Sequence, residues 1–589
     1  MRMKIFDALK KLFSFPGCSS NGQEEPDNAG QDNERRLATQ DEAECREAPS
    51  PSEEDGWADA AEYIQLGFTE FTTEKGVIGF YLDPDNRWIQ LAGEVFRPGM
   101  EELYQERLMQ LRDTTKGGRL AARLEKLKQD EEVAAYGAQL AIPHIDLAVS
   151  QAVADKTSVE GEESKAGRNP FPFRLVFGIL VAQAILNLSD RGICKLVAES
   201  PYLQYFLGFT SFSTRHTVHP SSLVHFKKRL DEPTMEKING IVHKNLLSAA
   251  DFKAAVHAGA EDAGPENTGR AQSGDAGRGE TPGGIPGNSG TLILDATCGP
   301  VNIRYPQDFS LLNEGRLDLE AIINRLCNDY QFPKPRTYVR TIQKEATNLS
   351  KSKRKSGEDI RHVLRLELNA VKRNLEHIDN FLASGPSDML YVEEIEKIQI
   401  IRAVYAQQKY MFDSKTHRVT NRIVSLSLPF VRPISRGKVN RPTEFGPKYD
   451  IAVDEDGFSW ITCFSFDNFS ESTHLKDAVE SYKEKTGHYP DRVLVDQIYR
   501  NTENRKYCKD LGIRISGPPL GRKPKDEDVL QELISVEKQD MTDRISVERH
   551  FSREKRCFGI EEIVERTEET IGHAIGMAVF LDNVVPAGF

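Results

Sequence analysis

The chain has 589 residues, of which 39% are hydrophobic and 28% are charged, and its formal net charge is −13. This length is too great for a single hydrophobic core and predicts about three or four domains. The eight cysteines form no Cys-x2-Cys pair, which argues against a zinc ribbon or a secreted disulfide framework and favours the cytoplasm. No apolar run reaches the roughly 18 residues that a membrane span needs.

The charge is unevenly distributed along the sequence. Residues 21–60 carry thirteen acidic side chains and three arginines, a net charge of −10. In contrast, residues 334–355 and residues 415–448 each hold eight basic side chains and one glutamate. Such segregation is a better guide to a polyanionic partner than the net charge.

The first part of the chain is predicted to begin with a disordered segment and to continue with helical regions. Residues 1–56 are polar and acidic, and we expect a disordered N-terminal extension. Residues 57–168 form a second region, with predicted helices over 100–111 and 120–133 and a polar linker at its end. In residues 169–250 apolar side chains recur at helical spacing and predict a compact helical domain. The residues leave open whether this domain is a plain helical bundle or a module that binds DNA ends.

A composition change then marks a domain boundary. Residues 251–290 are rich in glycine and predict a flexible linker. Beyond it, residues 291–585 alternate short apolar strands with helices, and a charged helical insertion is predicted over about 307–411. The expected core strands are TLILDAT, FGPKYDIAVDED, FSWITCFSFDN, RVLVDQ and GIRIS, with an extra strand at RIVSLSLP.

Without the insertion and the extra strand, the predicted order is strand, strand, strand, helix, strand, helix, strand, helix. This is the order of a ribonuclease H-like α/β domain with a mixed sheet. In that fold the first and fourth strands lie side by side at the centre of the sheet. Asp295 ends the first strand and Asp496 ends the fourth, so we expect their carboxylates to lie close together.

The last long helical segment carries the spacing Arg544-x3-Glu548-x6-Lys555. On a helix these three side chains face one groove, because residues four and seven apart lie on the same face. A carboxylate there suits metal binding, while the two cations suit phosphates of a bound strand. The spacing alone also fits an ordinary Arg–Glu pair on a solvated helix, worth a few tenths of a kcal/mol.

Three converging carboxylates have a specific chemical use. Phosphodiester cleavage and strand transfer need an activated oxygen nucleophile and a stabilised leaving oxygen, and two divalent ions about 3.5–4 Å apart can provide both. Mg²⁺ prefers carboxylates, water and phosphate oxygens. We therefore take Asp295, Asp496 and Glu548 as candidate catalytic residues and metal ligands.

Several long stretches resemble insertion-sequence DDE transposases, in particular the insertion-sequence-4-type group with a Tyr-x2-Arg-x3-Glu-x6-Lys catalytic helix. Arg544, Glu548 and Lys555 match that signature, while Met541 stands at the Tyr position. The other similar stretches are FPFRLVFGILVAQ, LSDRGICKLVAESPYLQYFLGF, LDATCGPVNIRYPQDFSLLNE, VLVDQIYRNTENRKYCKDLGIRISGPPLGRKP and VERHFSREKRCFGIEEI. The resemblance runs from about residue 74 to 585, with divergent or inserted stretches near 112–168 and 252–288.

This resemblance implies a DNA transposase that binds the terminal inverted repeats of its own element as a homodimer or higher multimer. It would cleave DNA to release a 3′-hydroxyl and join that hydroxyl to target DNA. Two Mg²⁺ ions, or Mn²⁺ in their place, would be held by Asp295, Asp496 and Glu548. Arg544 and Lys555 would contact DNA phosphate. The enzyme would be cytoplasmic, associated with the nucleoid when bound to DNA, and would have no membrane partner.

The two basic stretches are further candidates for contact with DNA. Arg432, Arg436 and Lys438 precede the second core strand, near the expected opening of the active site. The stretch 334–355 lies in the helical insertion, where a phosphate-binding or protein-contact surface competes with a merely solvated helical pair. Two alternatives to the transposase also stay open: a ribonuclease H-like nuclease without strand transfer, and an inactive DNA-binding regulator derived from a transposase.

Overall fold

The computed structural model describes most of the chain beyond residue 71. The described residues are 72–73, 76–77, 82–83, 85–112, 116–154, 170–209, 212, 218–260, 287–386, 388–435, 443–518, 521, 524 and 526–585. The predicted extension at 1–56, residues 261–286 of the predicted linker, Arg436 and Lys438 lie outside them.

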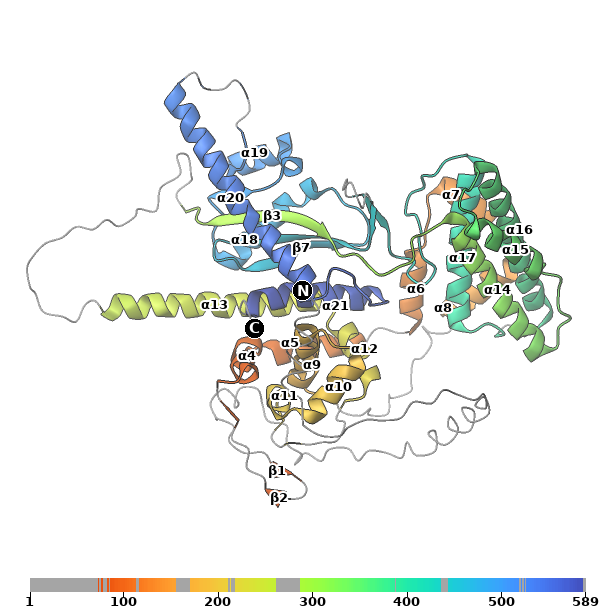
Figure 1. Cartoon of the computed structure of the whole chain (residues 1–589), viewed down its shortest axis with the longest axis horizontal. Helices are drawn as coiled ribbons and strands as arrows, with labels where there is room; N and C mark the ends of the chain where they lie inside the picture. Colours follow the sequence, from red (N-terminus) through yellow and green to blue (C-terminus); the bar gives the residue numbers. More distant parts are fainter. Residues whose placement is uncertain are drawn as a thin grey trace, which may run out of the picture. The chain divides into compact units, whose positions relative to one another are not determined.

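A five-stranded mixed sheet forms the core of the C-terminal domain (Figure 1). Its strands are β3 (Thr291–Cys298), β6 (Lys448–Val453), β7 (Ser459–Ser465), β8 (Arg492–Leu494) and β9 (Arg514–Ile515). They lie in the order β7-β6-β3-β8-β9, with β7, β6 and β3 antiparallel and β3, β8 and β9 parallel. The first and fourth core strands are thus neighbours, and the predicted ribonuclease H-like fold class is confirmed.

The two faces of this sheet are covered by different helices. On one face, helix α18 (Leu475–Thr486) packs its apolar side against Leu292, Leu294 and Trp460. On the other face lie α20 (Glu527–Cys557) and α21 (Glu568–Val584), which pack against Ile293, Ile451 and Leu494. Burial on both faces explains why β3 is a continuous apolar run up to Asp295.

An Asp-Gly turn joins β6 to β7. Gly457 adopts a φ of +82° there, and Asp454 Oδ1 accepts from the backbone N–H groups of Asp456 and Phe458. The extra strand at RIVSLSLP is wrong. A short hairpin of β4 (Pro433–Ser435) and β5 (Thr443–Phe445) follows it instead.

The insertion between β3 and β6 is helical, as predicted. It consists of α14 (Asp308–Tyr330), α15 (Val339–Lys351), α16 (Gly357–Ser384) and α17 (Val392–Asp413). Its interior also holds a fully buried Arg316, which donates to Glu367 at 3.0 Å and to Glu320 at 2.7 Å. Such a pair of buried ion contacts specifies one packing of α14 against α16, because an unpaired buried charge is very costly.

Three helices from the region before residue 169 pack against this insertion. The sequence did not predict this packing. They are α6 (Lys116–Glu125), α7 (Glu131–Ala138) and α8 (Pro143–Ala154). Figure 1 shows them among the green helices of the insertion, and Leu140, Ile142 and Ile145 belong to its apolar core. The single helix predicted over 120–133 is therefore wrong: the chain breaks at residues 126–130 between α6 and α7.

The remaining N-terminal helices, including those predicted within residues 169–250, form an apolar bundle whose core is continuous with one face of the sheet. Its members are α4 (Arg87–Val95), α5 (Met100–Arg112), α9 (Phe173–Leu186), α10 (Asp190–Glu199), α11 (Pro201–Phe206), α12 (Pro220–Arg229) and α13 (Glu232–Ala260). Ser189 caps α10 and His219 caps α12. Helix α13 continues to Ala260, ten residues into the segment expected to be linker.

The burial of α9 explains its unusually apolar sequence. Every residue from Phe173 to Gln183 is buried in the bundle. Among the described residues no single helix is long and apolar enough to span a membrane. Helices α9 and α10 pass that test only as a pair bent by 107°.

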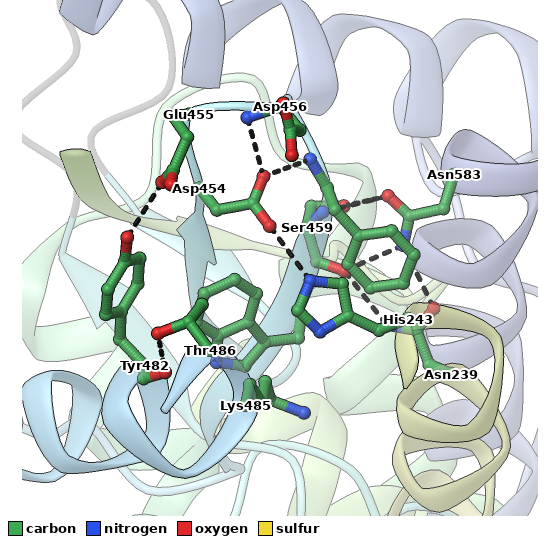
Figure 2. Close-up of polar contacts among 12 residues, drawn as sticks. Asn239, His243, Asp454, Glu455, Asp456, Ser459, Tyr482, Lys485, Thr486 and Asn583 are labelled. Carbon is green, nitrogen blue, oxygen red and sulfur yellow. Dashed lines mark hydrogen bonds and ion pairs between the residues drawn. The ribbon is translucent and has the colours of Figure 1, made fainter. Parts of the chain in front are cut away.

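Helix α13 attaches the bundle to the sheet through a buried polar network (Figure 2). His243 Nε2 lies 3.0 Å from Asp454 Oδ2, and Asn239 donates to the backbone oxygen of Ser459 at 2.9 Å. Asn583 from α21 donates to that same oxygen and to Asn239. Each element therefore contributes to one network, which fixes the β6–β7 hairpin relative to α13 and α21.

The shorter elements complete the fold. They are β1 (Thr72–Thr73), β2 (Gly76–Val77), η1 (Glu471–Thr473), η2 (Gln497–Tyr499) and α19 (Thr502–Asp510). The side chain of Asn501 caps α19 by accepting from the Asn504 N–H at 2.8 Å.

The buried carboxyl group of Glu554 on α20 predicts a pH-dependent stability. Burial raises its pKa from 4.5 to about 7, although Tyr449 donates to it at 2.7 Å. The folded state thus binds a proton that the unfolded state releases, so this contribution to stability is present at low pH and is lost as the pH rises through about 7. Glu554→Gln removes this dependence. Between pH 5 and 8 the wild type should lose about 2–3 kcal/mol more unfolding free energy than the variant.

Denaturant unfolding of the full chain at the two pH values measures this difference. Glu532→Gln, an exposed acid on the same helix, is the matched control and should follow the wild type. Parallel pH profiles for wild type and Glu554→Gln would contradict the assignment.

Candidate active site

The sheet aligns Asp295 with Asp496. In the parallel pair of β3 and β8, Ile293 lies opposite Leu494, and each aspartate is two residues further along its strand direction. Side chains two residues apart point to the same face. Ile293 and Leu494 both pack under α20 and α21, so both aspartates belong to that face. Asp496 lies just beyond β8, still in extended conformation, and its side chain caps η2.

Helix α20 crosses this face (Figure 1) and is anchored to the sheet by polar contacts near its middle and towards its C-terminal end. Near its middle, the buried Asp540 accepts from Arg514 at 2.6 and 2.7 Å and from Arg492 at 3.2 Å, which joins the helix to β9 and β8. Towards its end, Glu554 and Lys555 bind Tyr449 and Thr297. These two residues lie opposite each other on β6 and β3.

Arg544, Glu548 and Lys555, which the sequence predicted as site residues, lie on this anchored part of α20. Arg544 Nη1 is 3.5 Å from Asp295 Oδ2, and Lys555 Nζ donates to Thr297 Oγ1 at 2.7 Å. Glu548 lies one turn after Arg544 and next to Val547, which is fully buried against the sheet. Its own side chain is exposed. The fold therefore brings Asp295, Asp496, Arg544 and Lys555 to one face and places Glu548 on the helix that covers it.

The surroundings of Asp295 are electrostatically crowded. Burial raises the pKa of its carboxyl group to about 6, against the opposing effects of the Ala296 N–H and Arg544. Glu471 and Asp496 add like charge and raise the pKa further. A carboxyl group in this setting favours any additional cation, because a cation offsets both the burial and the repulsion.

A second polar group on the opposite side of β6 was not predicted. Asp450 is buried and accepts a hydrogen bond from Tyr499 Oη at 3.1 Å; burial raises the pKa of its carboxyl group to about 7. Lys448, two residues earlier, pairs with Glu471 at 2.7 Å. The sequence contained a signal for this group, because an acid and a lysine stand inside the otherwise apolar KYDIAV strand. Charged groups are rarely buried without partners.

The donor set has the chemistry of a site for a divalent cation. Asp295, Asp496 and Glu548 offer only carboxylate oxygens, which are the donors that Mg²⁺ prefers, and the crowding at Asp295 favours added positive charge. Their side chains are not gathered around one point, however. Among the described residues, no three His, Cys, Asp or Glu side chains are grouped as metal ligands, and Asp295 pairs with Arg544.

Arg432 lies elsewhere. Its side chain is buried, donates to the Pro429 carbonyl and lies 3.4 Å from Asp467. It borders a cleft of about 640 Å³. Six acidic residues line that cleft against three basic ones, so its charge does not favour phosphate. Its contact with DNA stays a prediction, as do those of Arg436 and Lys438.

Two family models match this chain. One, described as a transposase DDE domain, matches residues 493–584; the other, described as a transposase domain (DUF772), matches residues 139–229. Both matches support an insertion-sequence DDE transposase. Comparisons with curated proteins and with solved structures gave no match. The assignment to the insertion-sequence-4-type group stays a prediction.

The two matches fall on distinct parts of the transposase fold. The DDE match includes Asp496, Glu548 and the α20–α21 pair, while Asp295 lies before it. The other match runs from α8, which packs on the helical insertion, to α12 in the N-terminal bundle. This domain match therefore spans two apolar cores.

We expect the hydrogen bond from Tyr499 to Asp450 to stabilise η2, the turn that follows Asp496. Tyr499→Phe leaves a buried carboxyl group with one partner fewer, so it should cost about 1–3 kcal/mol of unfolding free energy. We also expect faster hydrogen–deuterium exchange at the backbone N–H groups of Tyr499 and Arg500, which bond to Asp496 and Gln497. Tyr507→Phe, which removes a hydroxyl bonded to the exposed Glu480, is the control. Equal exchange in both variants would contradict this role.

Proposed function

We propose that this transposase cleaves DNA at the ends of an insertion sequence in a reaction that depends on divalent metal, and then joins the released 3′-hydroxyl to target DNA. The observation that carries the proposal is the alignment of Asp295 with Asp496 beneath α20, the helix that bears Glu548. Three carboxylates on these elements are the set that such phosphoryl transfer needs.

In this proposal Asp295, Asp496 and Glu548 would hold Mg²⁺ or Mn²⁺. Bound metal would supply an activated oxygen nucleophile and charge stabilisation at the leaving oxygen. The exposed position of Glu548 allows its carboxylate to turn towards Asp295. The anchors at Asp540 and Glu554 keep the helix backbone in place while it does so.

Arg544 and Lys555 would act on the DNA. The Arg544 guanidinium is 28% exposed and only 3.5 Å from Asp295, a distance that permits exchange of the carboxylate for a phosphate oxygen. Lys555 lies along the same helix at Thr297, which would place its charge beside the strand that enters the site. Met541 replaces the Tyr of the signature and is 61% exposed, so that contact would be lost.

The substrate would be double-stranded DNA carrying the terminal inverted repeats, bound by a homodimer or a higher multimer. Its sequence is sought in the DNA that flanks the gene. Wild type should cleave a short duplex from these flanks with Mg²⁺ or Mn²⁺ and produce joined product. Asp295→Asn, Asp496→Asn and Glu548→Gln should each lower the rate on the order of a thousandfold, equivalent to about 4 kcal/mol of transition-state stabilisation.

Glu532→Gln is the matched control, since it removes an exposed charge from the same helix four turns before Glu548. Calorimetric titration with Mn²⁺ gives a readout apart from catalysis, and the three site variants should each weaken Mn²⁺ binding. Cleavage without joined product would identify a nuclease. Activity that survives all three substitutions would remove the proposed site, and end binding without cleavage would favour a regulator.

A further inference from the structure

One part of the helical insertion carries exposed cations that have no acidic partner. They lie on α15 and on the loops at its two ends. These cations are Lys334, Arg336, Arg340, Lys344, Lys351, Lys353 and Arg354. Within the described part of the chain, no carboxylate oxygen lies within 4.0 Å of these groups. We refer to these seven residues as the α15 cationic face.

The three cations on the helix form a single row. With about 100° of rotation per residue, Arg340, Lys344 and Lys351 fall within about 40° of one another around the axis. The opposite side of the helix is apolar: Ile342, Ala346 and Leu349 are buried against the rest of the insertion. At a rise of about 1.5 Å per residue the row extends over about 16 Å.

Several cations elsewhere on the surface of the insertion are paired, although the exposed Arg361 and Arg365 on α16 are not paired with an acid. Lys372 lies 3.9 Å from Glu376, Lys397 lies 3.3 Å from Asp318, and Arg325 lies 3.0 Å from Asp329. Lys409 also pairs with Asp413 one turn away. These four pairs contrast with the α15 cationic face, where seven neighbouring cations lie without such a pair among the described residues.

The loop that leads into α15 is held rigidly. The guanidinium groups of Arg336 and Arg373 lie over the ring of Tyr338, at 4.8 and 5.0 Å from its centroid. Arg373 also donates to the Thr337 backbone oxygen at 2.8 Å. Tyr338 remains 46% exposed beside Arg336 and Arg340. A fixed tyrosine hydroxyl among cations is a group that commonly contacts DNA phosphate.

We propose that the α15 cationic face binds the phosphate backbone of duplex DNA without regard to sequence, at a place separate from the Asp295 site. The row of cations matches a polyanion, because duplex DNA carries one charge per strand every 3.4 Å or so along its axis. About 16 Å of helix thus faces four to five phosphates of one strand. Contacts of cations with backbone phosphates carry no sequence information directly. The inference rests on the proposed function only in taking DNA as the substrate.

The test compares two triple variants of the full chain that change the net charge equally. Arg340→Gln/Lys344→Gln/Lys351→Gln neutralises the row. Lys372→Gln/Lys397→Gln/Lys409→Gln neutralises three paired lysines of the same insertion. Binding of a random-sequence duplex of 30 base pairs is measured by fluorescence anisotropy in EDTA, from 50 to 200 mM salt. Equal thermal unfolding midpoints show that both variants are folded.

The row variant should reduce the slope of log K against log salt by about 2.7, since each lost phosphate contact contributes about 0.9. At 100 mM salt its affinity should fall on the order of a hundredfold. The control should change the slope by less than one. Equal changes in the two variants, or no change in the row variant, would overturn the proposal.

Two further measurements distinguish this inference from the proposed cleavage site and from binding of an acidic protein segment. Asp295→Asn should leave the salt slope unchanged, so failure of the cleavage assay and failure of this face are told apart. Polyglutamate is the second probe. If polyglutamate binds with the same dependence on the row while the duplex does not bind, the face serves an acidic protein segment and the proposal fails.

Discussion

The site depends on the polar anchorage of α20 across the sheet. Asp540 ties the helix to Arg492 and Arg514 on β8 and β9, and Glu554 with Lys555 ties it to β6 and β3. Val547 and Phe551 fill the space between with apolar contacts. Because the anchoring carboxyl groups are buried, α20 cannot shift along the sheet at low cost. A shift of one residue would leave Asp540 and Glu554 unpaired at a cost of several kcal/mol. The geometry of Arg544 and Glu548 over Asp295 follows from this constraint.

Much of the fold was predictable because its signals are local or periodic. The five core strands, the helical insertion and the buried α9 each follow from runs of apolar residues whose period matches the element. The sheet order followed from the order of the elements. Asp295 and Asp496 could be paired in advance for the same reason, since parallel neighbours bring equivalent strand ends together.

The rest depends on contacts between distant segments. Nothing local in α6, α7 or α8 shows that they pack on the insertion, because an apolar helix face does not identify its partner. The burial of Arg432, which lies 3.4 Å from Asp467, likewise cannot be seen in its own segment. The hydrogen bond of Tyr499 to Asp450 joins η2, which follows β8, to β6, and these two strands are not adjacent in the sheet. Side-chain direction at Glu548 likewise depends on the whole site and not on the spacing in its helix.

The buried network at His243 and Asn239 has a consequence for chain length. The placement of α13 on the β6–β7 hairpin is set by side chains that bond directly to Asp454 and Ser459. The covalent connection from α13 to β3 therefore has no mechanical part in that placement. The placement of α13 should therefore not depend on the number of residues between Ala260 and Gly287.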